Sequence, residues 1–168
     1  VKPKQVYKMR RDSQFGPFHI RVGTFEMQIG STSLSDSQHA FFWEKTDLYG
    51  GFRVYRDGLR VMPYGRSDSD YFRIDERRSK RAGTSFWSNR RMFGRVSISR
   101  EYNANLKDKA GREGFIENRA SKLFREVVEN ILMAVAKKYF STESDIRMPA
   151  MKSIQQEKAL LKAAEDKN

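Results

Sequence analysis

The sequence predicts an α+β fold with a C-terminal helical extension. Two patterns lead to this prediction: short stretches of alternating apolar residues, and one long helical stripe late in the chain. The length of 168 residues suits one domain with a short appendage. We expect an α+β domain over 1–142, followed over 143–168 by a helical linker or the start of a coiled coil.

Three regions carry strand signals. Apolar residues alternate over 18–29 with one skipped step at Gly23, which predicts two short strands or one strand with a bulge. A hairpin is predicted over 52–62, because Asp57 and Gly58 separate two alternating runs and suit a turn with two positive φ angles. A further strand is predicted over 93–99. Between these regions, we expect a loop at 30–38.

Two helices are predicted in the last third of the chain. Leu123, Val127, Ile131 and Val135 repeat every four residues, which predicts an amphipathic helix over 119–140 with a broad buried face. Asn118 is the expected N-cap of this helix. A final helix is expected after Pro149, where Ser153 and Gln156 have capping-box spacing.

The composition indicates which kinds of partner the chain can bind and excludes several kinds of chemistry. Thirty-three Lys and Arg against 21 Asp and Glu give a net charge of +12, which favours nucleic acid, nucleotide phosphates or an acidic protein surface as partners. The absence of cysteine excludes disulfides, thiolate metal sites and cysteine nucleophiles, and the two histidines do not make a metal set. No apolar run approaches the ~20 residues that span a bilayer, so we expect no membrane partner and a cytoplasmic protein.

The stretch 66–91 is rich in arginine and has no sustained period, so we expect a long basic loop with one helical turn. Aromatic residues interleave with arginines over 66–100, a pattern typical of surfaces that clamp a nucleic-acid backbone and stack its bases. A solvated basic loop would give the same pattern. The candidate nucleic-acid contacts are Arg77, Arg78, Lys80, Arg81, Arg90 and Arg91. The separate aromatic run 41–43 is interpreted as core or interface packing.

The sequence contains few motifs that would indicate an enzyme that acts without a further domain. Neither the Rossmann glycine motif nor a P-loop occurs, so the chain alone is not expected to hold a nucleotide. Glu113 and Glu117 are spaced one helical turn apart, but such pairs are common at charged helix starts and do not indicate acid–base catalysis.

Two segments resemble the second, transducer domain of ATPases in the superfamily of gyrase, heat-shock chaperones, histidine kinases and MutL, abbreviated GHKL. The first is GGFRVYRDGLRVMPYG at 50–65, and the second is GRVSISREYNANLKDKAGREGFIEN at 94–118. Their order, and the amphipathic helix directly after them, add to the resemblance. The segment FGPFHIRVGTFEM at 15–27 is similar to the opening strand of the same domain. The resemblance covers about residues 15–140 and favours chaperone-like or MORC-like relatives. It implies an α+β fold with a mixed or antiparallel sheet and helices packed on one face of that sheet.

The resemblance also implies roles for residues of one loop. In the related chaperones a Ser-Arg-Glu motif before a long helix supplies an arginine to the γ-phosphate of ATP, and Arg112-Glu113 falls on that motif. Arg112 is therefore assigned the γ-phosphate role, and a guanidinium suits it because it stays charged and offers forked donors. Lys107 and Lys109 would add positive potential near the phosphates. Glu113 is given an orienting role, and Asp108 is expected to brace the loop.

The nucleotide-binding domain of this superfamily carries a helix with a catalytic Glu and a magnesium-binding Asn, an Asp-x-Gly-x-Gly motif and a glycine-rich lid. None of these occurs in the present sequence. The resemblance thus implies an excised transducer domain, not catalytic alone, of an ATP-driven conformational machine. ATP and Mg would be held mainly by an N-terminal nucleotide-binding domain in cis. ATP-dependent homodimerisation, and DNA or RNA as a partner, are further implications.

Overall fold

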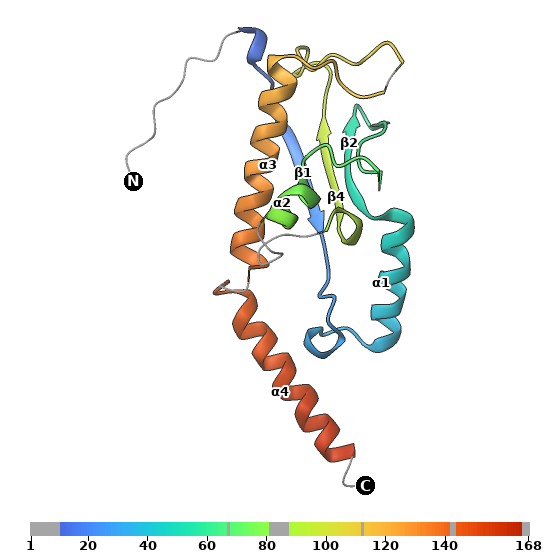
Figure 1. Ribbon diagram of the computed structural model, residues 1–168, viewed down its shortest axis with the longest axis vertical. Coiled ribbons are helices and arrows are strands. Elements are labelled where there is room, and N and C mark those ends of the chain that lie inside the picture. Colours follow the sequence, from blue (N-terminus) through green and yellow to red (C-terminus); the bar gives the residue numbers. More distant parts are fainter. Residues whose placement is uncertain (1–10, 67, 81–87, 112, 142–143, 166–168) are drawn as a thin grey trace, which may run out of the picture.

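The chain forms an α+β structure around a four-stranded mixed sheet (Figure 1). The computed structural model describes residues 11–66, 68–80, 88–111, 113–141 and 144–165. The strands lie in the order β1-β4-β2-β3, with β4 antiparallel to β1 and parallel to β2, and with β2 antiparallel to β3. Their bounds are Phe18–Gly23 for β1, Gly51–Arg56 for β2, Leu59–Val61 for β3 and Phe93–Ile98 for β4. The predicted fold class is confirmed.

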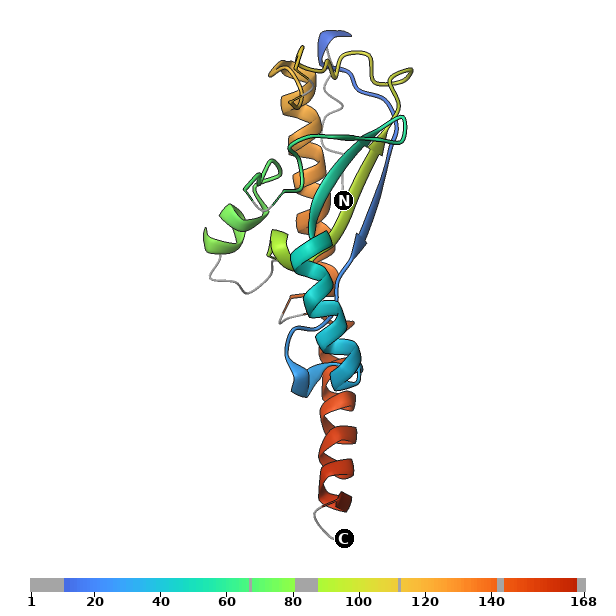
Figure 2. The same ribbon diagram turned by 90° about the vertical axis from the view of Figure 1, so that its right-hand side faces the viewer.

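The two faces of the sheet differ, because successive strand residues point to opposite sides. Phe52, Val54 and Val96 are at most 2% exposed and pack in the core. The helix α3 (Arg119–Tyr139) covers this face, with Phe124 and Leu132 fully buried against it. In Figure 2, α3 and the short helix α2 (Ile74–Lys80) lie on one side of the strands, and no described element covers the other side.

The hairpin and the long helix form as predicted. Asp57 and Gly58 both have positive φ, 49° and 82°, at the turn between β2 and β3. Asn118 caps α3 by accepting a hydrogen bond from the Ser121 backbone N–H, and the Ser121 hydroxyl accepts one from the Asn118 backbone N–H. The Asp57-Gly58 turn and the Asn118 cap were both predicted from residues close together in the sequence, and both are confirmed.

The region 18–29 contains one strand and no second one. β1 ends at Gly23, and Ile29 begins the single turn η2 (Ile29–Ser31). The expected loop at 30–38 is wrong in its last residues, because the helix α1 (Asp36–Tyr49) begins there. Ser35 and Gln38 form a capping box that starts this helix.

The aromatic run on α1 is more exposed than expected. Phe41, Phe42 and Trp43 are 54%, 37% and 40% exposed, so the expected core packing of this run is not observed. Three consecutive residues point in three directions around a helix, so they cannot share one buried face. Two of the rings are partly covered: Phe42 packs against Phe25 with ring centres 5.6 Å apart, and the Arg91 guanidinium lies 3.8 Å from the centre of the Trp43 ring.

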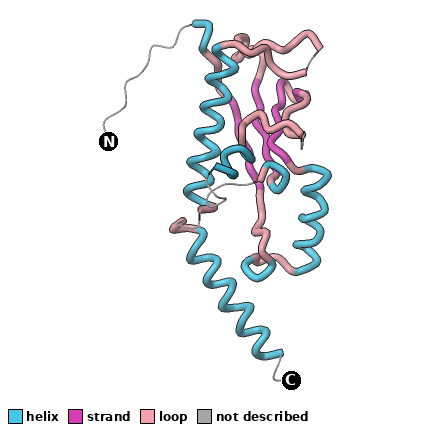
Figure 3. The backbone as a smooth tube through the Cα atoms, in the orientation of Figure 1, coloured by secondary structure: helices cyan, strands magenta, loops and turns pink. Residues whose placement is uncertain are grey.

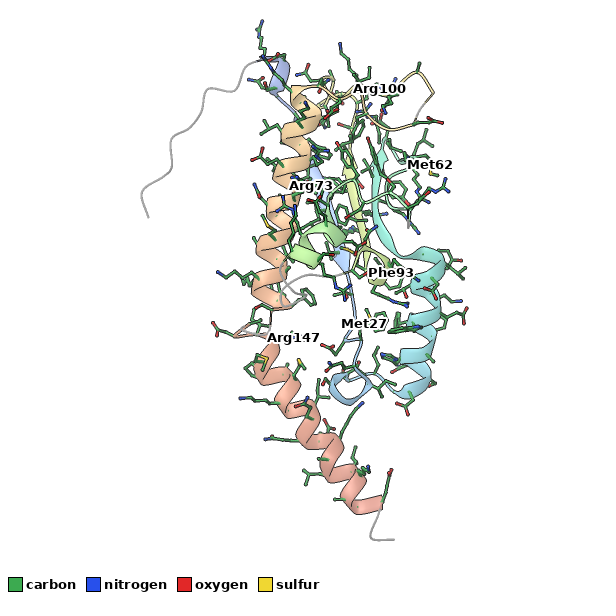
Figure 4. All side chains as sticks on the ribbon, viewed as in Figure 1. Met27, Met62, Arg73, Phe93, Arg100 and Arg147 are labelled. Carbon is green, nitrogen blue, oxygen red and sulfur yellow. The ribbon has the colours of Figure 1, made fainter. Side chains whose placement is uncertain are left out.

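The described part of the basic stretch 66–91 contains a helix and a helical turn and is not one long loop. Asp70 caps α2, because its carboxylate accepts hydrogen bonds from the backbone N–H groups of Ile74, Asp75 and Glu76 at 2.7–3.2 Å. A second turn, η3, spans Asn89–Arg91. Arg73, just before α2, donates two hydrogen bonds to Glu129 of α3, whose side chain is fully buried (Figure 4). This ion pair holds α2 against α3.

The C-terminal helix α4 (Arg147–Glu165) begins earlier than predicted. The Ser144 hydroxyl accepts hydrogen bonds from the backbone N–H groups of Ile146 and Arg147, so Ser144 caps the helix, and the predicted capping box at Ser153 is wrong. Pro149 lies in the first turn, where a missing N–H breaks no helical hydrogen bond. Figure 3 shows α4 running away from the sheet. Its first turns contact the segment after β1, through an ion pair of Arg147 with Glu26 at 2.7 Å.

Candidate functional site

The loop that connects β4 to α3 contains the predicted cofactor contacts. It crosses the end of the sheet at the N-terminus of α3, and Arg100 marks its start (Figures 1 and 4). Lys107, Lys109 and Glu113 are all exposed on it. The structure thus brings these three residues to one loop, with their charged groups open to solvent.

The loop is a small hairpin. Asp108 and Phe115 pair as an antiparallel bridge, the Lys109 N–H donates to the Gly114 carbonyl at 2.9 Å, and the Ile116 N–H donates to the Lys107 carbonyl at 2.8 Å. Arg112 falls between these pairs in the sequence and lies outside the described residues. We call residues 107–116 the basic hairpin.

A buried arginine ties the basic hairpin to the sheet. Arg56 ends β2 and is only 6% exposed. Its guanidinium forms an ion pair with Asp108 at 2.7 Å, donates to the Leu106 carbonyl, and lies 5.1 Å from the centre of the Phe115 ring. A buried charge is expensive unless it is paired and hydrogen-bonded, so these contacts fix the base of the hairpin against β2.

A tyrosine fixes the other strand of the basic hairpin. The Tyr64 hydroxyl accepts a hydrogen bond from the Phe115 N–H at 2.7 Å. Gly114 has a φ of +90°, and a Cβ there would lie 2.5 Å from the Tyr64 hydroxyl oxygen, so a glycine is needed for this approach. Burial raises the pKa of Tyr64, although its hydrogen bond to Phe115 opposes the shift.

A pocket of about 280 Å³ lies beside the basic hairpin. The rings of Tyr64 and Tyr71 form one wall, with centres 4.1 Å apart. Burial is also the main cause that raises the pKa of Tyr71, and the nearby Tyr64 adds to it. The charged lining groups are of both signs, namely Lys109, Glu113, Glu117, Lys122 and Arg125. This mixture does not make a phosphate cradle by itself, and no group of three or more potential metal ligands occurs among the described residues.

Several of the predicted nucleic-acid contacts of the basic tract also make contacts within the chain. Arg77 on α2 pairs with the buried Glu129, and Arg91 stacks on Trp43 and donates to Thr46 at 2.7 Å. Lys80 pairs with Glu76 on the same helix. Arg78 is exposed on α2, and Arg81 lies outside the described residues. Arg90, which belongs to η3, forms an ion pair with Asp47 at a distance of 3.5 Å. Arg77 and Arg91 therefore each have structural contacts within the chain.

Arg56 was not singled out from the sequence, although a signal for it exists. It continues the alternation of Phe52 and Val54, so it occupies a position where the strand pattern requires a buried residue. An arginine at such a position predicts a partner of opposite charge, and Asp108 is that partner.

Fold and site define an α+β protein with a braced basic hairpin at one end of its sheet. Comparisons with protein-family models, with curated proteins and with solved structures give no match for this chain. Within the described part of the chain, no helix is long and apolar enough to cross a membrane.

Proposed function

We propose that this chain is the transducer domain of an ATP-driven conformational machine. In this proposal Arg112, on the basic hairpin, contacts the γ-phosphate of an ATP molecule. A nucleotide-binding domain in cis holds that ATP and its Mg, and Lys107 and Lys109 raise the positive potential around the phosphates. The sequence resemblance to GHKL transducer domains supports the assignment of Arg112.

The observation that carries the proposal is the anchoring of the basic hairpin by Arg56. An exposed loop that merely carries charge needs no buried partner. Here the buried Arg56 guanidinium contacts Leu106 and Asp108, so the hairpin and the end of β2 are held together. A force on the tip of the hairpin would therefore act on the sheet rather than only on the loop.

The hairpin is also joined to α3, so that a movement of the hairpin on phosphate binding is passed on to this helix. In the first turn of α3, the Ser121 hydroxyl donates to the carbonyl of Ile116, the last residue of the hairpin, at 3.0 Å. The Asn118 side chain, which caps the helix, donates to the Asn105 carbonyl just before the hairpin at 2.8 Å. A shift of the hairpin on phosphate binding would move the first turn of α3, and α4 follows α3 in the chain. Domain closure around a ligand commonly uses such packed elements to carry motion.

The test is ATP turnover by the protein in which a nucleotide-binding domain precedes this chain. We expect Arg112→Ala to lower kcat at least tenfold with a small change in KM, because an arginine on a transferring phosphate contributes about 10³ to 10⁵ in rate. Arg119→Ala is the matched control. It removes an exposed arginine that pairs only with the surface residue Asp12 among the described residues, and should leave turnover unchanged. Unchanged turnover in the Arg112 variant would overturn the proposal.

A further inference from the structure

The uncovered face of the sheet carries a row of arginines. Arg21 of β1 pairs in register with Arg95 of β4, and Arg95 pairs in register with Arg53 of β2. Neighbouring strands lie about 4.8 Å apart, and residues in register point to the same face. Arg21 and Arg95 are exposed, and Arg53 is half-buried. We call Arg21, Arg95 and Arg53 the arginine row.

A second row lies next to the arginine row on the same face. It runs through His19, Ser97, Tyr55 and Arg60, which pair in register across all four strands. His19 and Arg60 are exposed, while Ser97 and Tyr55 are half-buried. The face therefore combines four guanidinium groups with an imidazole and a phenol ring.

These arginines differ from most others in having no acidic partner. Among the described residues, no carboxylate oxygen lies within 4.0 Å of a guanidinium nitrogen of Arg21, Arg53, Arg60 or Arg95. Most of the other described arginines form ion pairs, namely Arg56, Arg66, Arg73, Arg77, Arg90, Arg91, Arg100, Arg119, Arg125 and Arg147. Like charges directly opposite each other on a sheet are destabilising. The arginine row is therefore unfavourable for folding and suits an external anion.

The arginine row ends in a polar pocket of about 530 Å³ at the β2–β3 edge of the face. Four arginines line it, Arg53, Arg60, Arg66 and Arg90, against the single carboxylate of Asp47. Gly51 and Gly65 also line it, and a Cβ on Gly51 would lie 2.3 Å from the Gly65 carbonyl oxygen.

The charges around this pocket are close enough to influence one another. Partial burial and the positive charge of Arg53 and Arg66 lower the pKa of Arg60, while Tyr55 opposes the shift. Arg53 Nε is buried and has no hydrogen-bond partner among the described residues. An anion in the pocket would relieve this repulsion and could supply the missing partner.

We propose that the uncovered sheet face binds a single strand of nucleic acid. Its phosphates lie on the arginine row and in the adjoining pocket, and one base stacks on Tyr55. Guanidinium groups bind phosphate through two parallel donors, and unpaired bases stack on aromatic rings. A duplex is disfavoured because its base faces are covered and could not reach Tyr55. This surface is separate from the basic hairpin, so the inference does not depend on the proposed ATP role.

The test is binding of fluorescein-labelled oligo(dT) and oligo(U) to the full chain, followed by fluorescence anisotropy over a range of salt concentrations. In the triple variant Arg21→Gln/Arg53→Gln/Arg95→Gln, the slope of log Kd against log salt should fall by about 2, since each phosphate contact with a single strand contributes about 0.7. The control is Lys137→Gln/Lys152→Gln/Lys162→Gln, which removes the same charge from exposed positions on α3 and α4. This control should keep the slope of the unchanged protein.

Two further measurements separate a binding site from a general charge effect. Tyr55→Ala should weaken binding about tenfold, and Tyr55→Phe, which keeps the ring, should not. The thermal midpoint of the triple variant should be equal to or higher than that of the unchanged protein, because three opposed charges are removed. Equal slopes in the two triple variants, or duplex DNA that binds as tightly as oligo(dT), would overturn the proposal. The two labelled strands tell DNA from RNA as the preferred ligand.

Discussion

The Arg56 guanidinium lies 2.7 Å from the Asp108 carboxylate, and this ion pair joins the end of β2 to the loop before α3. Asp108 Oδ1 and Arg56 Nε are also buried, and neither has a hydrogen-bond partner among the described residues. The two side chains are therefore held by the ion pair itself and by the hydrogen bond from Arg56 to the Leu106 carbonyl. These two contacts hold the base of the basic hairpin against β2.

Arg56→Met should lower the free energy of unfolding by about 2 kcal/mol, because it removes the short ion pair with Asp108 and leaves the Leu106 carbonyl without its donor. Urea unfolding of the full chain measures this difference. Arg100→Met is a matched control, since Arg100 is exposed and lies 3.7 Å from the same carboxylate. A loss below about 0.5 kcal/mol for Arg56→Met, the range of ordinary surface changes, would contradict the anchoring role.

The pair Arg56→Met/Asp108→Leu tests the same point from the other side. If the charge left behind causes most of the loss, removing both partners should recover part of the stability of Arg56→Met. Additive losses in the double variant would show instead that the two residues act independently.

Alkaline stability should depend on Tyr71. Burial raises its pKa above the value of about 10 that it has in the unfolded chain. Above pH ~10 the unfolded state loses the phenol proton and the folded state keeps it, so stability is complete below this pH and falls as pH rises. Each pH unit in that window costs about 1.4 kcal/mol per such group.

Tyr71→Phe should therefore flatten the fall of stability at alkaline pH, although it also removes a weak hydrogen bond to the Ser121 carbonyl at 3.4 Å. Unfolding in urea at a series of pH values from neutral upward measures the slope. Tyr102→Phe is the control, because Tyr102 is 60% exposed. The same alkaline slope in all three proteins would argue against burial as the cause.

Asn118→Ala should destabilise the chain by about 1 kcal/mol, since it removes the cap of α3 and the link to Asn105. Asn118→Asp keeps an acceptor for the Ser121 N–H and should recover most of the loss. Thermal unfolding followed by circular dichroism gives both values. Equal losses in the two variants would show that the cap contributes little.

Local signals in the sequence predicted much of this fold. The Asp57-Gly58 turn and the stripe of α3 each depend on residues close in the chain, so their patterns are visible without the structure. The helix α1 was not predicted, because its consecutive aromatic residues make no single apolar stripe. The signal in the sequence that indicates this helix is the capping-box spacing of Ser35 and Gln38. The arginine row was not predicted either, and the reason is the order of the strands. Arg21, Arg95 and Arg53 become neighbours only because β4 lies between β1 and β2, which no local pattern reveals.

The central proposal, that the basic hairpin senses the γ-phosphate, has a direct test in hydrogen exchange. The protein that joins a nucleotide-binding domain to this chain would be measured with ADP and with a non-hydrolysable ATP analogue. We predict slower exchange at the Lys109 and Ile116 amides, which hold the hairpin together, only with the ATP analogue. Arg112→Ala should abolish that difference. Equal exchange of these amides with both nucleotides would contradict the proposal.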